Sequence, residues 1–208
     1  QFHIYKYVQK QKNVLIWENN FIHNKRRTAI PPIHHSGWMG FFAESFMKKY
    51  AGIGSRKVPD NIGELMTKIS ERLSEKGYSL RSGAAKGSDT FFEKGVKLSI
   101  INGKPSYNKE IFTAYDCTKK AILLASNYHP GFHNCNVYIK KLHGRNAMII
   151  LGKDLNDPVE FVVCWTEDGK DKGGTGLGIR LAEDKKIKIY NLFFEDVRKK
   201  FEKWLLKK

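Results

Sequence analysis

Short apolar runs alternate with runs of helical spacing from about residue 48 onward. The runs KYAGIG, YSLRSG, EFVVCW and IKIYNL predict strands, because they are apolar and are bounded by glycine, proline or polar turn residues. Between them, apolar residues recur every three and four positions, which is the spacing of a helix with one buried face. This spacing predicts helices over residues 60–76, 88–98, 113–127, 137–151, 174–186 and 194–206.

The alternation of strands and helices predicts a mostly parallel sheet covered by helices on both faces. We therefore expect a Rossmann-like three-layer α/β domain over residues 48–208. Residues 1–47 lack this alternation, and Pro31–Pro32 interrupts any helix there, so we expect an N-terminal appendage of unknown fold.

The formal net charge of the chain is +16, from 37 lysines and arginines against 21 acidic residues. Such an excess favours polyanionic partners such as nucleic acid, although lysines on solvated faces would explain it equally well.

No apolar run approaches the ~20 residues of a membrane helix, and the first residues lack a signal-peptide pattern. The three cysteines are widely spaced, as free thiols would be. We therefore expect a cytoplasmic protein that does not contact membranes.

The segment AGIGSRKVP lies between a predicted strand and a predicted helix. Gly54 lets the backbone approach a ligand closely, and the helix that follows offers free amides and a partial positive charge. Ser55 adds a hydroxyl donor, and Arg56 adds a planar fork suited to phosphate. The segment is therefore either a phosphate-binding turn or an ordinary structural turn.

Two later segments, SGAAKGSD and KGGTG, also lie between a strand and a helix. They contribute small residues and a second cation as candidate phosphate ligands: Ser82, Gly83, Lys86, Gly87, Gly173, Gly174 and Thr175. Asp89 is unsuited to phosphate, so it either caps the helix or contacts a sugar hydroxyl or a base. Three turns at the carboxyl ends of parallel strands would share one rim of the sheet, where open α/β sheets bind ligands.

The segment HGRNAMIILG places Arg145 and Asn146 early on a predicted helix. Either both side chains reach over the glycine turns toward a ligand, or Arg145 is a surface residue and Asn146 is a cap.

Two further residues are expected in the core. Cys164 lies inside an apolar strand, and Trp165 ends that strand, where base stacking is the alternative to core packing.

In sequence and order, these segments resemble the Rossmann-like domain of the DNA-processing protein A (DprA/Smf) family, in the SMF/DprA-LOG (SLOG) superfamily. The resemblance covers about residues 48–192, and the compact form is similar to small versions found in bacteriophages. It implies that Gly54–Arg56, Ser82–Gly83, Lys86–Gly87 and Arg145–Asn146 contact nucleic-acid phosphate, with residues 173–175 matching the last turn. It implies single-stranded DNA as the ligand, and related domains often pair as homodimers.

The same superfamily contains phosphoribohydrolases that cleave modified adenosine monophosphate, with a Gly-Gly-x-Gly-Thr-x-x-Glu turn whose glutamate is catalytic. Here GGTGLGIR has Arg180 at that glutamate position, and a cation cannot replace a carboxylate in that role. Asp89 and Glu93 are the carboxylates left near the predicted ligand. An enzyme or sensor acting on a small free nucleotide, by N-glycosidic hydrolysis or sequestration, therefore stays the alternative, and whether any reaction is catalysed stays open.

The segment HPGFHNC, followed by His143, contains candidate metal ligands. His129 and His133 have the spacing of two ligands on one helix, but Pro130 and Gly131 argue against a helix there. We therefore expect these residues, with Cys135, to serve capping and loop packing. We expect no metal and no cofactor.

Overall fold

The computed structural model describes residues 48–103 and 109–207. The expected N-terminal appendage, 1–47, lies outside the described residues. In the part that is described, none of the helices has the length and apolar character needed to cross a bilayer. The elements follow one another as β1 (Lys48–Gly54), α3 (Asp60–Glu75), β2 (Tyr78–Ser82), α4 (Ser88–Ile101), β3 (Glu110–Ile111), α5 (Lys119–Ser126), η1 (Phe132–Asn134), α6 (Val137–Leu151), β4 (Phe161–Trp165), α7 (Gly173–Asp184), β5 (Lys188–Asn191) and α8 (Glu195–Leu206).

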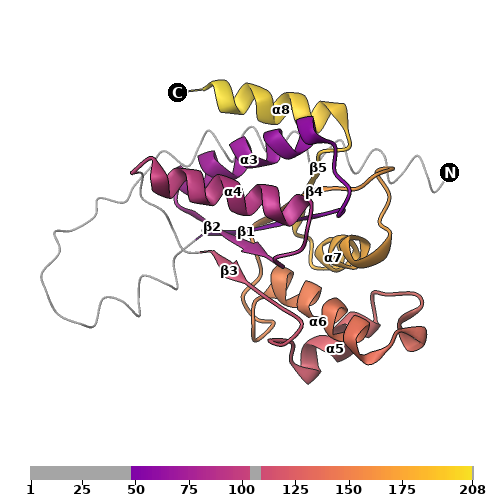
Figure 1. The fold of residues 1–208 in the computed structure, drawn as a ribbon. Helices are drawn as coiled ribbons and strands as arrows, with labels where there is room; N and C mark the ends of the chain where they lie inside the picture. The colour runs from indigo at the N-terminus through magenta and orange to yellow at the C-terminus, as the bar shows by residue number, and fades with distance from the viewer. Residues whose placement is uncertain (1–47, 104–108, 208) are drawn as a thin grey trace, which may run out of the picture. The chain divides into compact units, whose positions relative to one another are not determined.

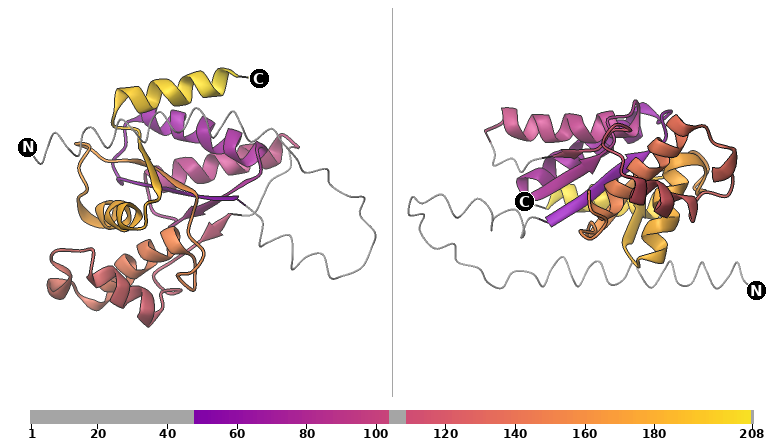
Figure 2. Two further views of the ribbon diagram at one scale, coloured as in Figure 1. Left: turned by 180° about the vertical axis from the view of Figure 1, so that it is seen from behind. Right: turned by 90° about the horizontal axis from the view of Figure 1, so that it is seen from below.

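The five strands form one parallel sheet in the order β3-β2-β1-β4-β5. The chain moves outward from β1 to β3 on one side and from β4 to β5 on the other, so the order reverses between β1 and β4. Helices α3, α4 and α8 lie on one face of the sheet and α5, α6 and α7 on the other (Figure 1). Figure 2 shows the same layers from behind and from below. The predicted three-layer α/β fold is confirmed.

Helix α3 buries the apolar stripe that the sequence predicts. Met66 and Ile69 are fully buried, and the stripe packs on α4 and on the sheet below. Beneath these helices Tyr50 of β1 is completely buried, and its hydroxyl lies 2.8 Å from the Ser70 hydroxyl of α3. A buried hydroxyl with a partner avoids the desolvation cost of an unpaired one, so this contact fixes α3 against β1.

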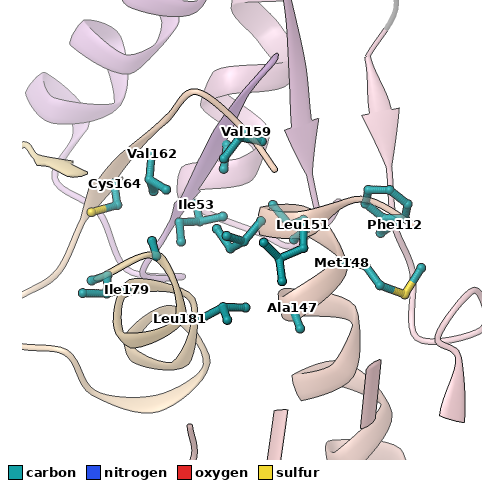
Figure 3. Packing of buried hydrophobic residues seen from close by; sticks show 14 of the residues in the cluster. Ile53, Phe112, Ala147, Met148, Leu151, Val159, Val162, Cys164, Ile179 and Leu181 are labelled. Carbon is teal, nitrogen blue, oxygen red and sulfur yellow. The ribbon is translucent and has the colours of Figure 1, made fainter. Parts of the chain in front are cut away.

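On the other face, a second apolar cluster joins β1 and β4 to α6 and α7 (Figure 3). Ile53 and Cys164 come from the two strands, Ala147 and Leu151 from α6, and Leu181 from α7. Cys164 is fully buried, and Trp165 is only 7% exposed, so the expectation that both residues pack in the core is confirmed. The cluster holds α6 and α7 against the carboxyl ends of the two central strands.

The helix predicted over residues 113–127 is shorter, and that prediction was wrong at its start. Helix α5 begins at Lys119, because the Thr118 side chain caps it by accepting a hydrogen bond from the Ala121 amide at 3.1 Å. Upstream, the carboxylate of Asp116 accepts bonds from the Thr113 amide and hydroxyl at 2.7 and 2.6 Å. Short polar side chains that bind nearby backbone favour turns and caps over helix interiors.

Arg81, on β2, is a buried charge that ties three segments together. Its side chain is 1% exposed. Its Nε donates to the Glu110 carboxylate of β3 at 2.7 Å, and its Nη1 donates to the Asp157 carbonyl at 2.5 Å. Its Nη2 also pairs with the Asp157 carboxylate. Because β3 has only two residues, this side chain is a main attachment of β3 to the sheet.

We predict that Arg81→Ala lowers the free energy of unfolding by about 3 kcal/mol, near the lower end of the cost of breaking a buried ion pair. The value lies at that end because the two carboxylates are 35% and 57% exposed and regain water. Urea denaturation measures the change. Lys172→Ala, which removes a surface ion pair with Asp168, is the control and should cost much less than Arg81→Ala. Equal effects of the two variants would contradict the prediction.

Candidate anion-binding pocket

A cavity of about 330 Å³ opens at the carboxyl end of β1, where the order of the strands reverses. Open α/β sheets bind ligands at this position, because the loops on the two sides diverge there. The pocket is formed by the end of β1, the β2–α4 connection, α6 and the start of α7. Its lining consists of Ile53, Gly54, Ser55, Arg56, Ala85, Asp89, Ile139, Leu142, His143, Arg145, Asn146, Gly174 and Thr175.

The end of β1 is held by backbone hydrogen bonds around Ser55. Its amide donates to the Trp165 carbonyl of β4 at 3.1 Å, and its carbonyl accepts from the amide and hydroxyl of Ser88 at 3.1 and 3.0 Å. The Ser55 hydroxyl oxygen accepts the Lys57 amide at 3.1 Å, which leaves its proton available to donate. Arg56 follows at the edge of the pocket, with an exposed side chain.

Asp89 organises the loop between β2 and α4. Its carboxylate accepts hydrogen bonds from the amides of Gly83 and Ala85 at 3.1 and 3.2 Å. Asp89 therefore braces the preceding loop, and the cap of α4 is Gly87, which has no side chain to bond with. Gly87 has φ +87° and packs against the backbone of Arg56, so a side chain there would be strained and obstructed.

Arg145 is the central cation of the pocket. It lies in the second half of α6, so the expectation that it falls early on its helix was wrong. The residue is 8% exposed, and its guanidinium lies directly over Gly83, whose missing side chain leaves room for it. Its Nη1 is 3.8 Å from the Asp89 carboxylate. Among the residues that the structure describes, its buried Nε has no hydrogen-bond partner.

The first turn of α7 provides backbone donors. The Asn146 amide group donates to the Gly174 carbonyl at 3.1 Å, which fixes the start of α7 beside α6. The N-cap residue of α7, Lys172, makes no side-chain capping bond, so the first amides lack a cap from that residue. The segment KGGTG is thus the beginning of a helix rather than a separate turn. The amino end of α7, with its partial positive charge, therefore lies at the pocket.

Burial changes the ionisation of two pocket groups. It raises the pKa of the Asp89 carboxyl to about 6, although the bond from Ala85 and the charge of Arg145 oppose the change. Burial also lowers the pKa of His143 to about 4, and the neighbouring charges of His129 and Arg145 add to this effect. At neutral pH, Asp89 is mostly ionised and His143 is uncharged.

The structure brings most of the predicted site residues to this pocket. Those that line it are Gly54, Ser55, Arg56, Asp89, Arg145, Asn146, Gly174 and Thr175. The others lie beside it or outside it: Ser82, Gly83, Lys86, Gly87 and Gly173. Gly83 leaves room for the Arg145 guanidinium and Gly87 packs against the backbone of Arg56, whereas Lys86 is an exposed loop residue.

Sequence reasoning missed the apolar wall of the pocket. Ile139, Leu142 and His143 lie on α6 at helical spacing with Asn146, so they share its pocket-facing side. This spacing is a signal that could have found them once Asn146 was singled out. Ile53 and Ala85 are the remaining lining residues that the sequence did not indicate.

Of the two candidate catalytic carboxylates, only one lies in the pocket. Asp89 lines the pocket, whereas Glu93 is outside the lining and pairs with Lys109 at 3.2 Å. Arg180 also lies outside it, since its Nε donates to the Tyr128 carbonyl at 2.7 Å and its Nη1 pairs with Asp171 at 2.9 Å. The pocket thus has one carboxylate of the pair that was considered.

A separate cluster of possible metal ligands adjoins the pocket. His129, Cys135 and His143 lie with their donor atoms within 4.8 Å of one another. His133, the other histidine of this segment, is exposed and outside the group. The two histidines of the cluster do not lie on one helix: His129 is in the connection before α6, and His143 is on α6.

Comparisons with known proteins do not assign this chain to a family. No family model matches the chain, and no curated protein matches it. One similar solved structure is the X-ray structure of DNA processing protein A (DprA) from Streptococcus pneumoniae, with 15% identity and a TM-score of 0.41. The likeness covers 77% of this chain and 56% of that one, so the chain spans little more than half of that protein. The resemblance to the DprA family stays a prediction.

Asp89 makes stability depend on pH in a defined direction. Folding raises its pKa from 3.8 to about 6, so the folded state holds this proton more tightly. The stabilisation is full below pH 3.8 and is lost as the pH rises through about 6, by up to about 3 kcal/mol. We predict that Asp89→Asn, which has no such proton, shows a smaller decline in the free energy of unfolding over this interval.

Urea denaturation at about pH 4.5 and about pH 7.5 tests this prediction. Asp154→Asn, which alters an exposed aspartate, is the matched control and should follow the wild-type protein. A decline in Asp89→Asn as steep as that of the wild-type protein would show that Asp89 is not the group responsible.

Proposed function

We propose that this pocket binds the phosphate of a nucleotide unit, and that the physiological ligand is single-stranded DNA. The observation that supports it best is the buried guanidinium of Arg145, whose Nε has no partner among the described residues and which lines the same cavity as Arg56. A buried donor without a partner costs free energy, and an anion in the pocket would supply the missing acceptor.

The other donors suit the same ligand. Guanidinium groups match phosphate oxygens in pairs, and the first amides of α7 add uncharged donors and the positive end of a helix. Ser55, which follows the end of β1 and lines the pocket, adds a hydroxyl donor. Together these groups could neutralise and orient one phosphate. Lys86 and Gly173 are exposed and would then contact adjacent phosphates, whereas Ser82 is fully buried and its hydroxyl donates to Glu93.

The apolar wall of α6 supports a nucleotide rather than inorganic phosphate. Ile139 and Leu142 offer a surface for a sugar or a base beside the cationic groups. Asp89 could contribute as well, because a carboxylate has about four acceptor positions and the two loop amides use only part of them. Its role would be to accept a hydroxyl or amino hydrogen from the sugar or base.

The charge of the chain favours a polymer over a free nucleotide, and the size of the cavity favours a single strand over a duplex. The net charge of +16 would attract additional phosphates on either side of the bound unit. A cavity of about 330 Å³ is at the small end of ligand pockets, so it suits one unstacked nucleotide and not a duplex. The motif order that resembles the DprA family supports the same assignment, with residues 48–208 as the binding domain.

The alternative is an enzyme or sensor for a free nucleotide, which the small volume of the cavity also suits. The residues considered for catalysis favour it less, because only Asp89 of the two candidate carboxylates lines the pocket. Arg180 would not supply a replacement, since it is engaged by Tyr128 and Asp171.

We predict that a labelled oligothymidylate binds with strong salt dependence and that Arg56→Ala weakens binding about 10–100-fold, the worth of a charge-assisted hydrogen bond. The slope of log affinity against log salt should become less steep by about one unit. Fluorescence anisotropy at about 50 mM and about 200 mM salt measures both quantities. Arg56 is exposed, so its loss should leave the fold intact.

Lys68→Ala is the matched control, because it removes the same charge from an exposed position of α3 outside the pocket. It should change affinity by less than about threefold, since separated surface charges are screened over about 10 Å. Equal binding by Arg56→Ala and the wild-type protein would sink the proposal. Salt-insensitive binding of mononucleotides with release of the base would support the alternative.

A further inference from the structure

The His/Cys cluster, formed by His129, Cys135 and His143, has features that loop packing alone does not explain. His129 lies in the connection between α5 and α6, Cys135 lies two residues before α6, and His143 lies on α6 itself. Their three donor atoms are within 4.8 Å of one another. Sulfur and imidazole nitrogen are the donors that zinc prefers in proteins.

Both histidines have a buried nitrogen that lacks a partner. The Nδ1 atoms of His129 and His143 make no hydrogen bond among the described residues, although both are shielded from solvent. The two rings lie 4.1 Å apart at an angle of 37°. Buried polar atoms are nearly always paired, because leaving one unpaired costs about 1–3 kcal/mol. Two neighbouring histidines that each keep an unpaired buried nitrogen, in one cluster with a thiol, point to a ligand that the three residues share.

The loop that carries two of these residues is held in place from both ends. Arg180 of α7 donates to the Tyr128 carbonyl at 2.7 Å, directly before His129. Asn136 caps α6 by accepting from the Ile139 amide at 2.9 Å, directly after Cys135. The loop therefore returns His129 and Cys135 to α6 beside His143, so the ligand set does not need two histidines on one helix.

We propose that His129, Cys135 and His143 bind a zinc ion. From zinc bond lengths, ligand atoms in a tetrahedral site lie roughly 3.3–3.6 Å apart, so side-chain rotations that close the present spacing by about 1 Å complete the site. The Cys135 thiol loses its proton as the Zn–S bond forms, and the proton passes to solvent. Three protein ligands leave a fourth position for water or an exogenous ligand.

The position of this site relates it to the pocket. His143 belongs to the cluster and also lines the anion-binding pocket, so bound zinc lies beside that pocket. The ion would add positive charge near Arg145. It would also give the two histidines the partner that they lack. The metal site does not depend on which nucleotide the pocket binds, and its test uses no nucleotide.

The experiment titrates Co²⁺ into the full-length, chelator-treated chain and follows the absorption spectrum. Cobalt bound to a thiolate gives a charge-transfer band in the near ultraviolet, and zinc should displace it. We expect about one equivalent to bind, with the band present. Cys135→Ser should abolish the band, and His129→Gln should weaken affinity by at least about tenfold, since loss of even an outer-shell partner costs about 10–100-fold.

Two controls match these variants. Cys117→Ser removes the other half-buried cysteine, and His133→Gln removes the exposed histidine of the same loop. Both should bind cobalt as the wild-type chain does, and circular dichroism checks that every variant folds. The proposal is overturned if the wild-type chain gives no thiolate band, if Cys135→Ser keeps it, or if His129→Gln binds as tightly as the wild-type chain. It is also overturned if Cys117→Ser removes the band.

Discussion

The parallel pairing of β1 with β4 is the constraint on which the pocket depends. These strands are far apart in sequence, and the register from Tyr50 with Phe161 to Gly54 with Trp165 brings their carboxyl ends level. The last bond of this series runs from the Ser55 amide to the Trp165 carbonyl. Because the connections from the two strands leave in opposite directions, this pairing opens the space that the pocket occupies.

Helix α6 then determines what that space contains. Its apolar side packs into the core through Ala147 and Leu151, so its position along the sheet is fixed by burial. Arg145 consequently lines the cavity, and Asn146 lines it too and bonds the start of α7. His143 lies three residues before Asn146 and contributes to both the pocket and the His/Cys cluster. Helix α6 thus contributes residues to the cavity, to the contact with α7 and to the His/Cys cluster.

The spacing of apolar residues and the turn residues predicted the layers of the fold and most residues that line the pocket. The pocket could be predicted because the carboxyl ends of parallel strands lie at one edge of the sheet. These sequence features could not predict contacts that depend on tertiary packing. Arg81 looked like one polar residue in a strand, and only the fold brings Glu110 and Asp157 to it. For Asp89 the sequence predicts a helix cap or a contact to a sugar or base, whereas its carboxylate bonds to the preceding loop. The meeting of His129 with His143 depends on the path of a loop without periodicity.

The contact between Gly83 and Arg145 has a consequence for how this sequence can diverge. The guanidinium occupies the volume that any side chain at position 83 would need. A chain with a larger residue there must therefore carry a shorter one at position 145, and would lose its buried cation in exchange. Positions 83 and 145 are more than sixty residues apart in the sequence. We expect them to change together among homologous sequences.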